Sequence, residues 1–168
     1  MHFVTPDARH EATVLAYREA FRAAGEKPYG SGGLHRAASY AEWLSGLERG
    51  RRAAAPGEGR APQEVYLALV GDELVGMLAL RLADAGDALR YAGNVGYSVR
   101  PDRRRRGYAT AMLRWALDRC RAAGLGRALL TCDRGNAASA RTIMRCGGAP
   151  AGELPEGDGF VEQYWIEL

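Results

Sequence analysis

Four consecutive arginines, Arg103 to Arg106, precede Gly107 in the segment RRRRGYA. An amphipathic pattern follows at once, and its apolar residues share one helical stripe: Ala109, Met112, Leu113, Ala116, Leu117 and Cys120. The first N–H groups of a helix lack partners within the helix, and the helix dipole adds positive charge at that end. Because glycine has no Cβ, a ligand can approach its backbone closely. The segment therefore predicts an anion site suited to phosphate or pyrophosphate.

Two widespread phosphate-binding motifs do not account for this segment. A P-loop ends in Gly-Lys-Ser/Thr, whereas the one lysine of the chain, Lys27, is followed by Pro28. A dinucleotide fold needs G-x-G-x-x-G, and Gly107 is the only glycine between Arg103 and Arg114. The arginine run is short and lacks interleaved aromatic residues, so we expect no nucleic-acid partner.

The segment resembles the acetyl-CoA pyrophosphate loop of the GNAT N-acetyltransferases. Residues Arg104 to Ala109 match the pattern Arg/Gln-x-x-Gly-x-Gly/Ala, and Tyr97 to Pro101 is similar to the strand that leads into that loop. The wider pattern, as far as the final YWIEL, is similar to a bacterial branch known mostly as predicted acetyltransferases. The resemblance implies a GNAT fold, in which two central strands splay apart and admit the pantetheine arm, with acetyl-CoA as co-substrate.

The resemblance also implies where the cofactor binds. Backbone N–H groups from Arg104 to Ala109 would hold the pyrophosphate, and the arm would run beside Tyr97 to Val99, where a strand N–H polarises the thioester carbonyl. Asn136 fits the family's pantetheine-contacting Asn and equally suits an ordinary helix N-cap. Ser139 lies at the same helix end, where it could touch the ligand or stay solvated. The cofactor-binding candidates are Tyr97, Ser98, Val99, Arg104, Arg105, Arg106, Gly107, Tyr108, Ala109, Thr110, Asn136 and Ser139.

The residues for proton transfer depart from the family pattern. Ile143 stands where a general-acid Tyr is usual, and Thr131 stands where a general-base Glu is often found. The candidates to protonate the departing thiolate are Tyr97, Tyr164 and Cys132, although packing is the ordinary role of buried aromatic and thiol side chains. Asp133, at a strand end, could accept a proton or cap a turn.

The expected reaction is direct attack by a primary amine of a small molecule on acetyl-CoA, without a covalent enzyme intermediate. Two alternatives stay open: a protein or peptide amine as acceptor, and a non-catalytic acyl-CoA sensor, which the residues Ile143 and Thr131 would suit. The N-terminal helices and the loops Tyr29 to Leu34 and Ala83 to Gly93 should shape the acceptor side. By analogy with the family, the chain could form a homodimer.

Composition limits the class of protein. The length of 168 residues and 47% apolar content suit one globular domain, with an acceptor-side portion (1–62), an acetyl-CoA core (64–148) and closing strands (149–168). The three cysteines are widely spaced and the histidines do not have metal-ligand spacing, so we expect reduced thiols, no metal and a cytoplasmic protein. No stretch predicts a signal peptide or a membrane span.

The pattern of apolar and turn residues predicts an α/β chain with a mixed (α+β) sheet. Helices are expected over Glu11 to Ala24, Ser39 to Arg49, the stripe after Gly107, and Asn136 to Cys146, the last with Ala140, Ile143 and Met144 inward. Gly30 to Gly33 reads as a flexible loop and Arg49 to Pro62 as a solvated one. Strands are expected at His2 to Thr5, Glu64 to Val70, Glu73 to Leu82, Asn94 to Arg100, Arg127 to Asp133, Ala149 to Leu154 and Phe160 to Leu168. The strand, helix, strand order from Asn94 to Asp133 predicts a parallel pair.

Overall fold

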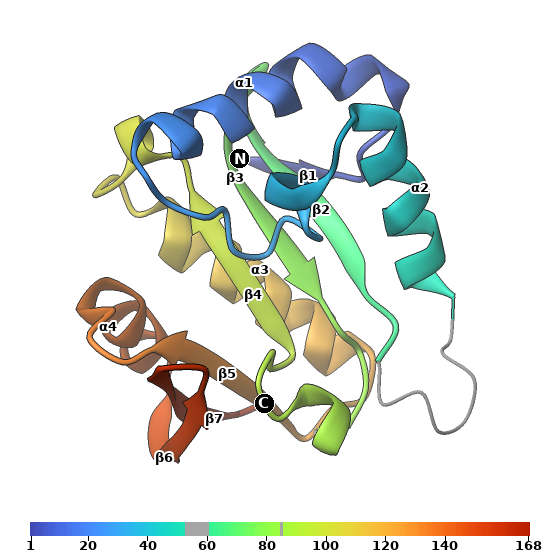
Figure 1. Ribbon diagram of the computed structural model, residues 1–168. Coiled ribbons are helices and arrows are strands. Elements are labelled where there is room, and N and C mark those ends of the chain that lie inside the picture. Colours follow the sequence, from blue (N-terminus) through green and yellow to red (C-terminus); the bar gives the residue numbers. More distant parts are fainter. Residues whose placement is uncertain (53–60, 85) are drawn as a thin grey trace.

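The computed structural model describes residues 1–52, 61–84 and 86–168 (Figure 1). The strands are β1 (His2–Val4), β2 (Glu64–Val70), β3 (Glu73–Leu80), β4 (Val95–Val99), β5 (Arg127–Asp133), β6 (Ala149–Glu156) and β7 (Gly159–Glu167). The helices are α1 (Glu11–Ala23), α2 (Tyr40–Arg51), α3 (Tyr108–Ala122) and α4 (Ala137–Arg145), with 3-10 turns η1 (Ala8–His10), η2 (Leu34–Arg36), η3 (Asp87–Leu89) and η4 (Pro101–Arg103). Helix α2 ends two residues later than predicted, so the predicted solvated loop begins after Arg51, and its positions 53–60 lie outside the described residues.

The strands form two separate sheets. One has the order β1-β2-β3-β4 and the other the order β5-β7-β6, and every described strand pairing is antiparallel. The prediction of a parallel β4–β5 pair in a mixed sheet is therefore wrong. A backbone bond links the two strand segments only where they begin, from Asn94 N–H to Leu129 O, and beyond that point the two strands diverge.

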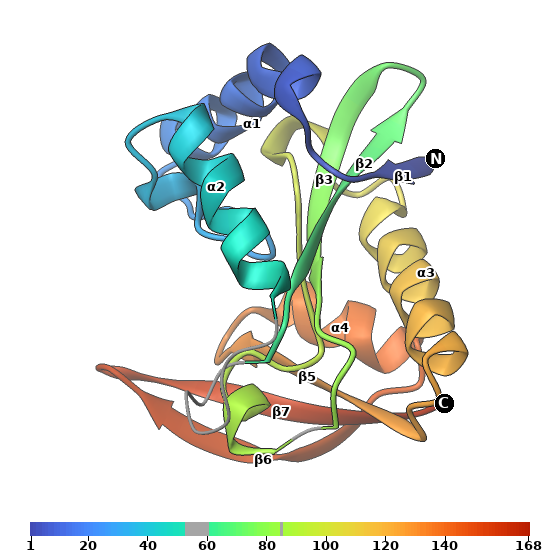
Figure 2. The same ribbon diagram turned by 90° about the vertical axis from the view of Figure 1, so that its right-hand side faces the viewer.

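Helices cover both faces of the first sheet. Figure 2 shows this sheet edge-on, with α1 and α2 on one side and α3 on the other. Helix α1 buries Val14, Tyr17 and Phe21, which recur at helical spacing. Helix α3 buries five residues of the predicted stripe: Met112, Leu113, Ala116, Leu117 and Cys120. The predicted anion loop is thereby fixed at the end of a helix that is anchored in the core.

The second sheet carries α4, which contacts both α3 and β5. Asn136 caps α4 as predicted, because its side chain accepts the N–H of Ser139 at 3.1 Å. Ala140 and Ile143 are buried, whereas Met144 is 47% exposed, so its predicted inward orientation is wrong. Helix α4 has nine residues and turns a narrow face to the core, and Met144 lies one residue, about 100°, beyond that face.

Candidate active site

Asn94 joins the two sheets at the point from which they separate. Its side chain is fully buried, and its Oδ1 accepts the N–H of Leu129 at 2.8 Å. Its Nδ2 donates to Arg81 O and to Ala83 O, both at 2.8 Å. Every polar atom of this side chain is thus used to hold β3, β4 and β5 together, and the cleft opens on the far side of this junction.

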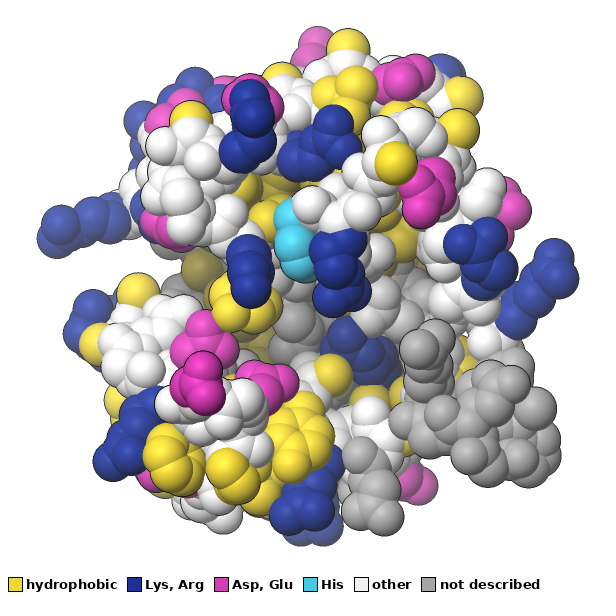
Figure 3. Space-filling view, in the orientation of Figure 1, with side chains coloured by type: hydrophobic (Ala, Val, Ile, Leu, Met, Phe, Trp, Pro, Cys, Tyr) yellow, Lys and Arg dark blue, Asp and Glu magenta, His cyan; other side chains and the backbone are white. Residues whose placement is uncertain are grey.

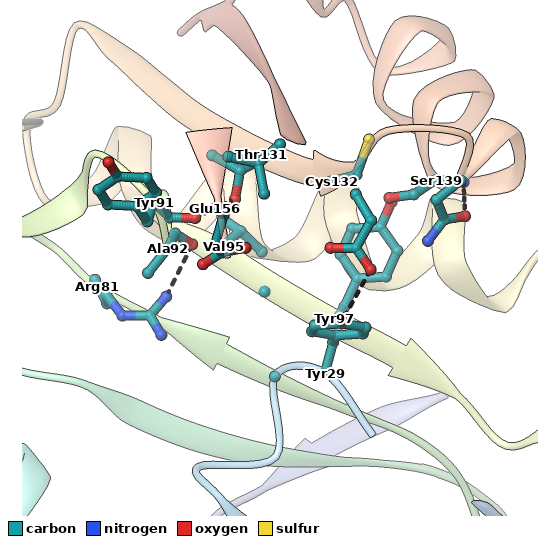
Figure 4. A pocket seen from close by; sticks show the side chains of 15 residues that line it. Tyr29, Arg81, Tyr91, Ala92, Val95, Tyr97, Thr131, Cys132, Ser139 and Glu156 are labelled. Atoms are coloured by element: carbon teal, nitrogen blue, oxygen red, sulfur yellow. Dashed lines mark hydrogen bonds between the residues drawn. The ribbon is translucent and has the colours of Figure 1, made fainter. Parts of the chain in front are cut away.

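A cavity of about 270 Å³ occupies the cleft between β4 and β5. Its walls come from strand residues 95–97 and 131–133, the first turn of α4, the loops at 29–30 and 91–92, Arg81, and the β6–β7 hairpin. Figure 4 shows that the labelled side chains from these separate elements surround one space. Both loops expected to shape the acceptor side contribute to it.

The loop before η2 crosses the open side of the cleft. Tyr29 OH donates to Asp133 Oδ2 at 2.7 Å, and Tyr29 O accepts from Ser98 Oγ at 2.5 Å. Gly30 lies so close to β4 that a Cβ at this position would stand 2.2 Å from Gly96 O. Ser31 is buried, and its carbonyl accepts the Trp43 indole N–H at 2.8 Å. The loop that reads as flexible in the sequence is therefore firmly packed against β4 and α2.

The free edge of β4 faces the cleft. Arg100 N–H donates to Val75 O, and Arg81 N–H donates to Asn94 O, so the even-numbered positions between them, Gly96 and Ser98, direct their backbone toward β3. Because strand residues alternate, the N–H groups of Tyr97 and Val99 point to the opposite edge. That edge is where the resemblance places a thioester carbonyl.

Two of the three candidates for proton transfer lie in the cavity wall. Tyr97 OH is 3.2 Å from Ser139 Oγ, and the Ser139 hydroxyl also neighbours the Cys132 thiol. Burial raises the pKa of Tyr97 to about 12 and the pKa of Cys132 to about 11, the latter with a further contribution from Glu162. At neutral pH both groups are protonated, so they can donate hydrogen bonds but release protons reluctantly.

Tyr164, the third candidate, is not one of the residues that line the cavity. Its hydroxyl donates to Glu162 Oε2 at 2.7 Å, and Cys132 Sγ lies 3.8 Å from the same oxygen. Burial and this carboxylate raise the pKa of Tyr164. The Tyr164 hydroxyl is thus linked to Cys132 of the cavity wall through the Glu162 carboxylate.

The two positions that depart from the family pattern have structural roles. Ile143 is fully buried, and Gly148 packs against it so closely that a Cβ there would be 2.4 Å from Ile143 Cγ2. Thr131 Oγ1 donates to Tyr91 O at 2.7 Å and so holds the 91–92 loop. Position 143 is thus filled by a buried hydrophobic side chain, and the hydroxyl of Thr131 is hydrogen-bonded to the 91–92 loop.

The predicted anion loop has the backbone shape that the sequence suggested. Arg105 and Gly107 have φ values of 63° and 81°, both left-handed, and Gly107 precedes α3 without a side-chain cap. The first helical bond runs from Ala111 N–H to Gly107 O, so the N–H groups of Tyr108, Ala109 and Thr110 come before it. Nothing lies within 4 Å of a Cβ built on Gly107. Open space therefore adjoins the donors of this loop.

The four arginines divide into two pairs. Arg103 binds Glu73 at 2.6 Å and Asp102 at 2.7 Å, and Arg104 binds Glu26 Oε1 at 2.9 Å and Oε2 at 2.5 Å. These bonds lower the pKa values of Glu73 and Glu26. Arg105 and Arg106 are exposed and form no ion pair with a described carboxylate. Only the second pair has side chains free to meet an anion in front of α3.

The candidates that the sequence singled out thus do not all lie in one place. The cavity brings together Tyr97, Cys132, Asn136 and Ser139, whereas the segment from Arg104 to Thr110 lies outside its lining. Ser98 points to the other face of β4, where Tyr17 OH contacts its Oγ at 3.0 Å, and Val99 O accepts from Arg104 Nε at 3.3 Å.

Sequence reasoning missed several polar residues of the cavity. Arg81 and Glu156 line it, and the side chain of Asn94 holds the junction beside it. None belongs to a motif, because each comes from a different segment and only the fold brings them together.

No described helix is long and apolar enough to cross a membrane. In residues 1–52, 61–84 and 86–168, no three His, Cys, Asp or Glu side chains form a group that could hold a metal ion.

Comparisons with known proteins fit this geometry. Mycobacterium smegmatis RimJ in complex with CoA-disulfide has a TM-score of 0.70 and 25% identity, over 98% of this chain and 80% of that one. The GNAT domain of S. lividans PAT has a TM-score of 0.65 and 15% identity, over 99% and 89%. Vibrio cholerae spermidine N-acetyltransferase SpeG, as an F149A mutant, has a TM-score of 0.65 and 14% identity, over 99% and 95%.

No curated protein sequence is similar enough to this chain to count as a match. The model of the acetyltransferase (GNAT) family, in contrast, matches residues 17–147. This range includes the anion loop, both central strands and α4. The chain therefore belongs to the GNAT acetyltransferase family, and it is an N-acetyltransferase that uses acetyl-CoA.

Proposed function

We propose that this acetyltransferase transfers the acetyl group of acetyl-CoA to a primary amine of a small molecule by direct attack. The observation that carries the proposal is the cavity beside the free edge of β4, walled by Tyr97 and Cys132 and by the carboxylates Asp133 and Glu156. Its volume of about 270 Å³ is below the range of pockets for drug-sized ligands, which favours a small acceptor.

The donor would bind from the side of α3. The N–H groups from Arg104 to Ala109 hold the pyrophosphate, with Arg105 and Arg106 beside it. The pantetheine arm runs into the cleft between β4 and α4, past Asn136 and Ser139. The N–H of Val99 or Tyr97, at the free strand edge, polarises the thioester carbonyl in the manner of an oxyanion hole.

The acceptor would enter from the side of Tyr29. An ammonium is attracted by Asp133 and Glu156, and Asp133 takes its proton directly or through one water. The neutral amine attacks the carbonyl carbon, the tetrahedral intermediate collapses, the C–S bond breaks, and an amide and a thiolate result. Holding amine and thioester side by side supplies much of the rate.

The departing thiolate is stabilised mainly by hydrogen bonds. An ordinary thiol has a pKa of about 8.5, well below the pKa of about 12 of Tyr97. Full proton transfer from Tyr97 to the thiolate is therefore unfavourable. A hydrogen bond from Tyr97 or Ser139 to the sulfur stabilises the thiolate without moving a proton, so the difference in pKa does not oppose it. The proton released by the attacking amine can end on the sulfur through solvent.

One pair of measurements tests the proposal. Calorimetry gives the affinity for acetyl-CoA, and thiol release is then followed over a panel of small amines and N-terminal peptides. We expect binding and turnover with at least one small amine. Turnover confined to peptides would favour a protein acceptor, and binding without turnover on any amine would favour a sensor. Absence of acetyl-CoA binding would refute the placement of the donor.

A further inference from the structure

Arg81 follows β3 directly and lines the cavity at the end where the sheets meet. Its Nη1 donates to Ala92 O at 3.3 Å and to Gly93 O at 3.1 Å, and its Nη2 donates to Gln63 Oε1. Figure 4 shows Arg81 beside Tyr91 and Ala92, with Tyr97 and Ser139 in another part of the same lining. The guanidinium is therefore held in a fixed position against neutral groups.

The charge of Arg81 has no counter-ion among the described residues. A guanidinium has five N–H donors, and these contacts account for three of them. Arg100, Arg103 and Arg104 each bind a carboxylate, but Arg81 forms no ion pair with any carboxylate that the structure describes. Burial lowers the pKa of Arg81. The other two donors have no partner among the residues that the structure describes. A partly desolvated cation of this kind is costly unless an anion binds it.

Carboxylates lie elsewhere in the same lining. Asp133 accepts from Tyr29 OH at 2.7 Å, and Glu156 is close enough to Tyr29 to raise its pKa, which burial and Asp133 bring to about 12. In Figure 3, basic and acidic side chains both flank the hollow between the N-terminal half and the β6–β7 hairpin. The cavity thus offers a cation and two carboxylates to a single occupant.

We propose that the acceptor is a small amino-acid-like zwitterion whose carboxylate binds Arg81 and whose amine lies near Asp133 and Glu156. This inference rests on the proposed function, because it names the substrate class of the same cavity. The two unused N–H donors of Arg81 bind the carboxylate, and Gln63 with the 92–93 carbonyls fixes the guanidinium for it. The carboxylate aligns the molecule, so that its amine reaches the free edge of β4.

The test is equilibrium binding to the enzyme in complex with CoA, because this readout does not depend on turnover. Calorimetry is run with each standard amino acid, and each one that binds is paired with the amine that lacks its carboxylate, such as phenylalanine with phenethylamine and lysine with 1,5-diaminopentane. A hydrogen-bonded charged pair corresponds to a preference of at least about ten-fold for the amino acid.

Two variants assign the preference to Arg81. In Arg81→Gln, the amino acid and its paired amine should bind within about two-fold of each other, because a neutral amide gives little preference for an anion. In Arg81→Lys, which keeps the charge, part of the preference should return. Melting temperature and acetyl-CoA affinity, both expected near wild type, show that each variant is folded; if Arg81→Gln does not fold, Arg81→Lys and the wild-type pairs decide.

The possible outcomes separate this proposal from the one on which it rests. Equal binding of amine and amino acid by the wild type, absence of amino-acid binding, or an unchanged preference in Arg81→Gln would overturn the assignment of Arg81. Acetylation of peptides with blocked carboxyl ends as fast as that of free amino acids would also overturn the assignment of Arg81. Amino-acid binding without thiol release would uphold the anion site and count against acetyl transfer.

Discussion

Asn94 and Leu129 exchange two hydrogen bonds, from Asn94 N–H to Leu129 O at 2.6 Å and from Leu129 N–H to Asn94 Oδ1 at 2.8 Å. One side chain thus replaces the ladder that a parallel strand pair would form. The two sheets are joined at this junction, and the space beyond it is left for ligands.

Replacing Asn94 with Ala should destabilise the fold strongly. The variant leaves the N–H of Leu129 and the carbonyls of Arg81 and Ala83 without their partners in a buried place, at about 2–4 kcal/mol in total. Denaturant unfolding measures the loss. Asn136→Ala is the matched control, since it removes an exposed helix cap and should cost about 1 kcal/mol. Equal losses in the two variants would contradict the role of the junction.

Gly107→Glu should weaken acetyl-CoA binding at least about ten-fold, because it puts bulk and negative charge among the donors at the start of α3. Gly124→Glu is the control. Gly124 has φ +82° and open space around it, as Gly107 has with φ +81°, but it lies beyond the other end of the helix. Calorimetry should show an affinity close to wild type for this control. Unchanged binding in Gly107→Glu would refute the pyrophosphate site.

Tyr97→Phe should lower kcat about ten-fold, because it removes a hydrogen-bond donor near the departing sulfur. Tyr164→Phe, which loses only the bond to Glu162, should change kcat less than about two-fold. Thiol release under saturating acetyl-CoA gives both values. A larger effect of Tyr164→Phe would move the group that stabilises the thiolate from the cavity wall to the last strand.

Asp133→Asn should lower kcat/KM by about a hundred-fold at neutral pH, since the amide can still accept from Tyr29 but takes no proton. The deficit should shrink as the pH rises, because more of the acceptor amine is then already neutral. Tyr29→Phe keeps the carboxylate and should reduce kcat/KM only slightly. A pH profile of the three proteins decides, and parallel profiles for wild type and Asp133→Asn would exclude Asp133 as the proton acceptor.

Stability should fall at alkaline pH, in part through Tyr97. An unfolded tyrosine has a pKa of about 10, whereas in the fold burial raises that of Tyr97 to about 12. Below pH 10 both states are protonated and the contribution is fully present, and from pH 10 to 12 the unfolded state loses its proton first, so stability decreases. Denaturant unfolding at pH 9 and 11.5 should show a smaller decline for Tyr97→Phe than for wild type. The same decline in both would contradict the shift.

The sequence predicts the parts of this site that depend on local pattern. Strand Arg127–Asp133, the start of α3 after Gly107 and the Asn136 cap all appear where apolar periodicity and turn chemistry put them. These features follow from residues close together in the chain, such as Asn136 and Ser139. The resemblance to the GNAT family predicts acetyl-CoA as the donor, and this resemblance also rests on short segments of the chain.

The rest depends on contacts between distant segments. Asn94 joins the start of β4 to Leu129 of β5 through its side chain, and Tyr29 meets Asp133 across 104 positions of the chain. Arg81 falls inside the predicted strand Glu73 to Leu82, and only the fold sets it against Ala92, Gly93 and Gln63. Such contacts leave no periodic pattern in the sequence, so only the structure identifies the polar residues of the acceptor side.

The approach of Gly30 to Gly96 has a consequence for how this enzyme could diversify. Two residues without side chains lie face to face where the Tyr29 loop meets β4, and a Cβ on Gly30 would collide with backbone atoms, which cannot rotate aside. The Tyr29 loop therefore already lies as close to β4 as two glycines allow, and this contact sets the width of the proposed acceptor entrance. Selection or engineering for bulkier acceptors would have to act on the opposite wall, at Tyr91 and the β6–β7 hairpin. Side chains there can change without moving β4, the strand that we propose holds the thioester.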